Sequence, residues 1–153
     1  MKTRELAYAA GIVDGEGCVT LRTRRPWGNE VSRICVPTLM VCNTDPRLTD
    51  WLRARFGGSV CCSLRPGSHQ KDVYRWSVVN RQCRAALLLL LPFLILKKAQ
   101  AEVLLASSRY LMDHKTYKGH SLPPELIVKR AAAIQEIRLL NRRGPPPAVT
   151  SQS

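Results

Sequence analysis

Polar and apolar residues alternate along four short stretches of the chain, and this period of two is typical of β-strands with one buried face. The four strands are expected at residues 18–25, 31–42, 59–65 and 72–79. Residues 66–69, Pro-Gly-Ser-His, form a turn sequence that joins the last two strands into a hairpin. Within the second strand Pro37 cannot donate a hydrogen bond to a neighbour, so an edge position or a bulge is expected there.

A helix is expected before the first strand, because apolar residues recur at helical spacing from Leu6 to Val13. This helix carries a second stripe of very small residues, Ala7 and Gly11. Since Gly inside a helix costs about 1 kcal/mol relative to Ala, Gly11 indicates close approach of another backbone. Asp14-Gly15-Glu16-Gly17 ends the helix and places two carboxylates at the negative pole of its dipole, where acids are unfavourable without a cation. The pattern predicts two packed helices that present carboxylates to a shared metal site.

The remaining helices are predicted from their start and stop signals. Thr3 can cap the first helix, and Asn43-Thr44-Asp45-Pro46 starts a second helix that ends at about Phe56. Three more helices are expected at about residues 81–91, 97–111 and 123–143, and Pro92 separates the first two. The apolar stripe expected on the last helix consists of Ile127, Ile134, Ile137 and Leu140.

The order of these elements defines the expected fold class. The order α-β-β-α-β-β-α-α-α predicts an α+β domain, residues 1–143, in which helices cover one face of a four-stranded antiparallel sheet. The other face of the sheet is expected to stay uncovered. Residues 144–153 are rich in Pro and Ser and are expected to form a disordered tail.

The charge of the chain indicates an anionic partner. Lys and Arg total 24 against 11 Asp and Glu, a net charge of +13 in 153 residues. Ribosomal and membrane-surface proteins share this balance, so its distribution is more informative. Between Gly17 and Thr44 the only acid is Glu30, and from Trp51 to Lys71 there is none. The outward face of the predicted sheet is therefore basic.

A basic β-ribbon fits the major groove of DNA, where Arg can bind guanine edges through two hydrogen bonds. The alternative is an ordinary polar strand face, against which the shortage of acids argues. The apolar outward residues of the second strand, such as Val36 and Met40, either meet thymine methyl groups or indicate a shifted register. The candidate DNA-binding residues are Thr20, Arg22, Arg24, Thr38, Ser63, Arg65, Arg75 and Ser77.

Other functional classes find little support in the sequence. The six cysteines show no zinc-ligand spacing, and the three histidines lie in predicted loops without a partnered motif. No secretory signal opens the chain, and the apolar run 87–96 is too short to span a bilayer. A soluble intracellular protein with free thiols is expected, without a membrane partner or a small-molecule substrate.

Residues 9–17, Ala-Ala-Gly-Ile-Val-Asp-Gly-Glu-Gly, resemble the LAGLIDADG motif of homing endonucleases. The alternative is a kinked core helix followed by an acidic turn. The predicted elements from about residue 3 to 112 also match the αββαββα order of that family. The resemblance implies that the motif helices of two subunits pack together at the centre of the assembly. Because the chain holds one motif, a homodimer is expected, with Ala7, Ala10, Gly11 and Asp14 at its interface.

The resemblance also implies an active site. The final acid of the motif binds a divalent metal, which assigns Glu16 and the backbone carbonyl of Gly15 to Mg²⁺, with Mn²⁺ or Ca²⁺ able to substitute. Residues 92–101 are similar to a segment of the single-motif endonucleases in which Lys97 aligns with an active-site lysine. A shift of one residue would assign that role to Lys98.

Two further residues align with the family's active site. Asn43 aligns with a polar residue that positions solvent, and Arg47 aligns with a basic active-site residue. Without the resemblance, Lys97 and Arg47 are read as solvated surface charges and Asn43 as a strand-end or capping residue.

The function implied is that of an intron-encoded homing endonuclease. Such an enzyme hydrolyses phosphodiester bonds in a long, partly palindromic DNA duplex and leaves short 3′ overhangs. It would act in the compartment that holds its target DNA, bacterial cytoplasm or an organelle. Two alternatives are an RNA-binding intron maturase and a catalytically inactive DNA-binding regulator. The acid at residue 16 argues against the regulator.

Overall fold

The computed structural model describes residues 1–24, 34–64, 71–112 and 123–142 of the chain. The element order and the α+β class predicted from the sequence are confirmed. The elements are α1 (Thr3–Glu16), β1 (Gly17–Arg24), β2 (Ile34–Asn43), α2 (Pro46–Phe56), β3 (Ser59–Ser63), β4 (Val73–Val79), α3 (Asn80–Leu90), the 3₁₀ turn η1 (Leu91–Phe93), α4 (Lys98–Met112) and α5 (Pro124–Leu140). The predicted turn at 66–69 and tail at 144–153 lie outside the described residues.

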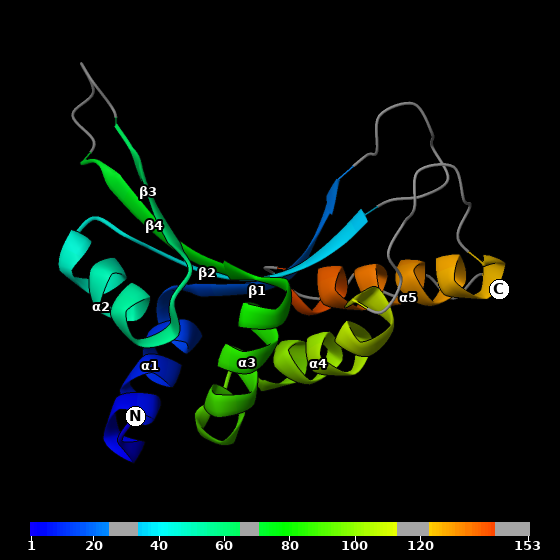
Figure 1. The fold of residues 1–153 in the computed structure, drawn as a ribbon, viewed down its shortest axis with the longest axis horizontal. Coiled ribbons are helices and arrows are strands. Elements are labelled where there is room, and N and C mark those ends of the chain that lie inside the picture. Colours follow the sequence, from blue (N-terminus) through cyan, green and yellow to red (C-terminus); the bar gives the residue numbers. More distant parts are fainter. Residues whose placement is uncertain (25–33, 65–70, 113–122, 143–153) are drawn as a thin grey trace, which may run out of the picture.

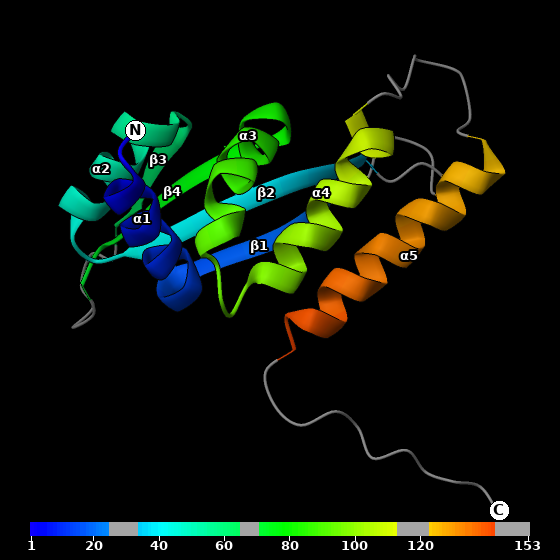
Figure 2. The ribbon, with the colours of Figure 1, turned by 90° about the horizontal axis from the view of Figure 1, so that it is seen from below.

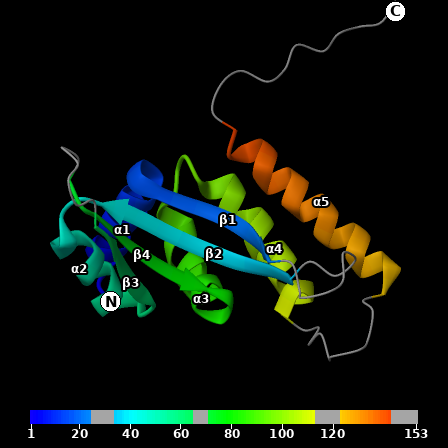
Figure 3. The ribbon, with the colours of Figure 1, turned by 90° about the horizontal axis from the view of Figure 1, so that it is seen from above.

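The four strands form one antiparallel sheet in the order β1-β2-β4-β3. Figure 1 shows that the sheet is strongly curved and that the five helices lie on one side of it. Seen from below, the helices stand in front of the strands (Figure 2), and seen from above, the strands stand in front (Figure 3). Within the described part of the chain, no helix covers the other face of the sheet, as the alternation predicts.

A single hydrophobic core lies between the sheet and the helices. From the strands it takes the alternate residues that the pattern predicted, including Val19, Leu39 and Trp76, all fully buried. Leu52 of α2 and Leu87 of α3 belong to the same cluster. The indole nitrogen of Trp76 donates to the carbonyl of Gly57 at 2.8 Å, so this large side chain is buried with its polar atom satisfied.

The boundaries of α1 differ from the prediction at both ends. Lys2, not Thr3, is the N-cap, because the helix begins one residue earlier than a Thr3 cap requires. The helix also continues through Glu16 and passes directly into β1 at Gly17. A Cβ atom at Gly17 would lie 2.5 Å from the carbonyl oxygen of Val13, so only glycine permits this tight turn.

Pro37 lies in a central strand, whereas the sequence predicted an edge position or a bulge. It pairs with Leu21 of β1. On the other side the pairing of β2 with β4 ends at Thr38 and Val79, because the chain turns into α3 after Val79. Over this end of β2 the proline has a strand neighbour on one side only.

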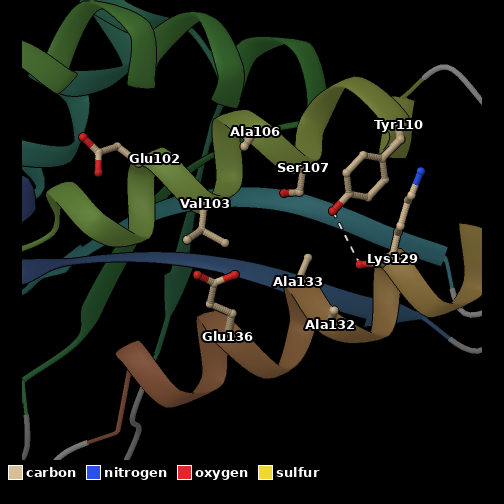
Figure 4. A pocket seen from close by; sticks show the side chains of 9 residues that line it. All are labelled: Glu102, Val103, Ala106, Ser107, Tyr110, Lys129, Ala132, Ala133 and Glu136. Carbon is tan, nitrogen blue, oxygen red and sulfur yellow. Dashed lines mark hydrogen bonds between the residues drawn. The ribbon is translucent and has the colours of Figure 1, made fainter.

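Helix α5 packs against α4 and β1. Its apolar stripe is confirmed at Ile134 and Ile137, which are buried, whereas Leu140 is exposed. A shallow groove runs between α4 and α5 (Figure 4), where the Tyr110 hydroxyl donates to the carbonyl of Lys129 at 3.4 Å. None of the described helices is long and apolar enough to cross a membrane.

Candidate nucleic-acid interface and catalytic site

The uncovered face of the sheet collects side chains from all four strands. The register places Thr20 opposite Thr38, and Ser77 opposite both Met40 and Ser59. The predicted faces are therefore correct, and the apolar residues on the open side of β2 belong there without a register shift. On this face Arg22, Arg75 and Ser63 are exposed, and Thr20 and Ser77 are half-buried. Arg65 and the side chain of Arg24 are outside the described part of the chain.

Thr38 was predicted to bind DNA, and its burial contradicts that prediction. It lies on the open face by register, but it is fully buried, and its hydroxyl donates to the carbonyl of Val36 at 3.0 Å. The reason is its central position between two cross-strand neighbours, Thr20 on β1 and Val79 on β4, at the close spacing of paired strands. The Thr38 side chain therefore lies beneath its neighbours on the open face and is not accessible to a ligand.

The arginines that the structure describes on the open face, Arg22 and Arg75, make this face electropositive. The four strands contain no Asp or Glu. In the described part of the chain no carboxylate pairs with Arg22 or Arg75, whereas three arginines of α2 are paired. These three pairs are Arg47 with Asp45, Arg53 with Asp50, and Arg55 with Glu5. Arg22 and Arg75 are exposed and have no carboxylate partner among the described residues, so their guanidinium groups are available to an external partner.

The C-terminal end of α1 brings Lys97 next to the acidic motif. The Lys97 ammonium donates to the main-chain carbonyl of Asp14 at 2.6 Å. The Asp14 carboxylate accepts the backbone N–H groups of Ile95 at 2.8 Å and Lys97 at 2.9 Å. The Lys97 ammonium therefore lies at the negative pole of the helix, where a positive charge is favourable. The metal that the sequence predicted at this end stays a prediction. Lys97, and not Lys98, makes this contact; Lys98 begins α4 and is exposed.

Glu16 occupies the last position of α1 and is exposed. Within the described residues no group of three or more His, Cys, Asp or Glu side chains could hold a metal ion. Glu16 is one carboxylate at a helix end, so any metal bound there would need further ligands from outside these residues. Mg²⁺ keeps several waters and takes one or two protein carboxylates together with substrate phosphates. The Glu16 carboxylate and the Gly15 carbonyl are oxygen donors of the kind that such a water-rich ion takes, so they fit it chemically, and their role as metal ligands stays a prediction.

Asn43 and Arg47 lie where β2 passes into α2. Gly17 pairs with Val41, so the end of β2 runs beside the C-terminal end of α1. The side-chain oxygen of Asn43 accepts the Asp45 N–H at 2.8 Å, and this bond closes a turn before the helix. Asp45 caps α2 through the N–H of Arg47, as the sequence predicted. The catalytic roles given to Asn43 and Arg47 stay predictions.

The Arg47 side chain is positioned by hydrogen bonds to Asp45 and is not buried. Its guanidinium donates to the Asp45 carboxylate, with Nε 3.0 Å from Oδ1, while 90% of its side chain is exposed. These hydrogen bonds lower the pKa of Asp45 to about 2. Asp45 is thus ionised at neutral pH and balances the charge of Arg47, which faces solvent.

Cys18 is a neighbour of this site that the sequence pattern did not single out. Burial raises the pKa of its thiol, the positive charge of Lys97 acts in the opposite direction, and Cys42 adds to the increase. Cys18 therefore lies close to both Lys97 and Cys42. A half-buried thiol has no motif of its own, so only the fold could reveal its position.

The exposed side of α1 carries the small residues of the predicted interface. Ala7 and Gly11 are exposed, and a Cβ atom at Gly11 would meet no heavy atom within 4 Å. The small size of Gly11 is therefore not required by its own chain. Ala10 was also predicted to lie at the dimer interface. It is fully buried in the protomer core and cannot reach a partner, so that prediction is corrected. Asp14 also faces its own chain, through the backbone of residues 95–97.

The overall fold matches solved homing endonucleases. I-CvuI, in complex with the I-CreI target in the presence of Mg, matches with a TM-score of 0.73 and 21% identity over 94% of this chain and 85% of its own. The archaeal intron-encoded I-Vdi141I, complexed with DNA, has a TM-score of 0.64 and 14% identity, with 94% and 88% covered. The LAGLIDADG homing endonuclease I-GzeII, in complex with its DNA target, has a TM-score of 0.60 and 18% identity, covering 87% of this chain but 43% of that one.

No protein-family model matches the chain, and no curated protein matches its sequence. The protein has the fold of the LAGLIDADG homing endonucleases. This confirms, for the fold, the resemblance carried by residues 9–17. The chain spans most of I-CvuI and I-Vdi141I and less than half of I-GzeII, so it corresponds in size to the shorter chains of this fold.

Proposed function

We propose that the protein is a site-specific, divalent-metal-dependent DNA endonuclease of the homing type. The observation that carries this proposal is the position of Glu16 and Lys97 at the end of α1 that runs into β1. This strand belongs to a sheet face on which Arg22 and Arg75 have no carboxylate partner among the described residues. A nuclease needs both features together, a surface for the duplex and a site that handles phosphate charge. The solved proteins that share the fold and contain DNA support the same conclusion.

Each residue of the site has a role that its chemistry allows. Bound Mg²⁺ would supply a Lewis acid and an activated water for phosphodiester hydrolysis. Glu16 would hold the metal through its carboxylate. The Lys97 ammonium neutralises negative charge on the phosphate as it develops. The side-chain oxygen of Asn43 is engaged in its turn, which leaves the amide nitrogen to orient water, and Arg47 offers a second cation.

The active form proposed is a homodimer. One Glu16 serves one strand of the duplex, so cutting both strands requires two copies related by a two-fold axis. The open space at Gly11 supports contact between two α1 helices at that axis. Exposed apolar side chains nearby also favour burial against a second copy: Tyr8 is 57% exposed, Ile95 83% and Leu96 72%. Such a dimer reads a long, partly palindromic target, leaves 3′ overhangs and acts in the compartment that holds its target DNA.

A cleavage assay on a library of randomised duplexes tests this function. With Mg²⁺, we expect cutting of a small set of related sequences whose two halves are nearly symmetric, and no cutting after EDTA is added. Binding of DNA without cutting under any metal would identify an inactive regulator. Selective binding of structured RNA without DNA cleavage would identify a maturase.

Arg22 and Arg75 are expected to read bases. Replacing either by Ala should relax base preference at particular positions of the target by about 1–3 kcal/mol, because a guanine edge loses a bidentate partner. Arg53→Ala is the matched control, since Arg53 lies on α2 and pairs with Asp50. Binding selection on the same library measures both. If the Ala variants instead lost affinity equally for all sequences, Arg22 and Arg75 would be phosphate contacts. DNA binding by the variants would then depend less on salt than binding by the wild-type protein.

A further inference from the structure

Asp14 makes three contacts with one short segment that lies more than eighty residues away in sequence. Its two carboxylate oxygens accept the N–H groups of Ile95 and Lys97, and its main-chain oxygen accepts the Lys97 ammonium. These contacts join the last turn of α1 to the link between η1 and α4. Glu16 belongs to the same turn, so the acid and the lysine of the proposed site are tied to one element.

Among the described residues, few other contacts fix residues 94–97, which connect η1 to α4. The side chains of Ile95 and Leu96 are largely exposed, so hydrophobic burial does not hold them within the protomer. Leu94, which is buried, anchors the segment on one side. On the other side the carbonyl of Lys97 accepts the Ala101 N–H at 3.0 Å and starts α4. Between these two points the backbone N–H groups have no helical partner, and Asp14 satisfies two of them.

We propose that Asp14 is a positioning residue that places the Lys97 ammonium beside Glu16. The inference deepens the proposed endonuclease function and rests on it. It also changes the role given to Asp14 by the sequence, where it was assigned to the dimer interface. The carboxylate is used within its own chain to orient a cation toward the phosphate, while Glu16 remains free for the metal.

The test compares Asp14→Asn with the wild-type protein in single-turnover cleavage with Mg²⁺, in DNA binding with Ca²⁺ and in thermal unfolding. Asparagine keeps the shape and one oxygen acceptor but loses the second acceptor. We expect the cleavage rate to fall by about 10–100-fold, as for other residues that orient a functional group, with DNA affinity unchanged within about threefold. Asp14→Ser is the second variant in case Asp14→Asn does not fold.

Glu5→Gln is the matched control. Glu5 also lies on α1, accepts the backbone N–H of Lys2 at 2.8 Å, and pairs with the cation of Arg55 at 3.0 Å. It lies at the opposite end of the helix from Glu16. We expect this variant to cleave at the wild-type rate. If it slowed cleavage as much as Asp14→Asn, a general weakening of α1 would explain both and the proposal would be wrong.

A double-mutant cycle with Lys97→Met shows whether Asp14 acts through the lysine. If it does, Asp14→Asn lowers the rate in the wild-type background and adds little once Lys97 is gone. Equal losses in both backgrounds would overturn the proposal, as would a wild-type cleavage rate in Asp14→Asn. A wild-type protein that cleaves no duplex would overturn the endonuclease function and this role together. Amide hydrogen exchange at Ile95 and Lys97, faster in Asp14→Asn but not in Glu5→Gln, checks the contact without DNA.

Discussion

Glu16→Gln is expected to abolish DNA cleavage and to leave specific binding nearly unchanged. The exposed carboxylate at the end of α1 is the one side chain of the motif that is free to hold a metal, since Asp14 is engaged with residues 95–97. Glutamine has the same shape but no charge, so metal binding is lost while the sheet contacts remain. Loss of a residue that holds the reacting centre lowers turnover by roughly 10³-fold or more.

The measurement is cleavage in Mg²⁺ beside a binding titration in Ca²⁺, with the same duplex. Glu102→Gln is a suitable control, because Glu102 is also an exposed acid but lies on α4 at the groove facing α5 (Figure 4). It should cleave normally. Cleavage at the wild-type rate in Glu16→Gln would remove Glu16 from the site.

Gly11→Leu has the second large expected effect, loss of the dimer together with loss of cleavage. Within one protomer the position is exposed and a Cβ atom there would meet no heavy atom within 4 Å, so we expect the variant to fold. Leucine also has a higher helix propensity than glycine, by up to about 1 kcal/mol. A loss of assembly can therefore come only from a second copy that approaches α1 too closely for a side chain.

Analytical ultracentrifugation, with and without target DNA, measures the mass of the wild-type protein and the variant. Thermal unfolding provides the control that the Gly11→Leu protomer is folded. Arg4→Leu, on an exposed position of the same helix, is the matched variant and should keep the wild-type mass. A wild-type protein that stays monomeric at micromolar concentration, even on DNA, would contradict the homodimer.

Residue patterns predicted the fold well because each pattern reports one local property. Alternation identified the faces of all four strands, and the Asp45-Pro46 pair identified the start of α2. Alternation reports a face and not a depth, so it could not show that Thr38 is covered by strands on both sides. In the same way, helical spacing groups Ala10 with the small residues near it but does not say which side meets the core.

The contacts that the sequence could not show are those between distant segments. Asp14 and Lys97 are 83 residues apart, and no local pattern links them. The family resemblance aligned Lys97 with an active-site lysine, and the structure adds the backbone contacts that bring it to α1. The sequence likewise gives no sign that Cys18 and Cys42 are neighbours. They lie close together because β1 pairs with β2.

Helix α5 has a consequence for how the protein behaves at high concentration. Strand β1 forms one edge of the sheet, and an exposed edge offers unpaired backbone groups to strands of other molecules. The amide of Asn141, just after α5, donates to the carbonyl of Val19 on this strand at 2.9 Å, and α5 itself packs along β1. The C-terminal helix and Asn141 therefore cover part of this edge strand, which leaves less of its backbone open to edge-to-edge pairing. A chain shortened before α5 would keep every element of the proposed active site and yet lose this protection.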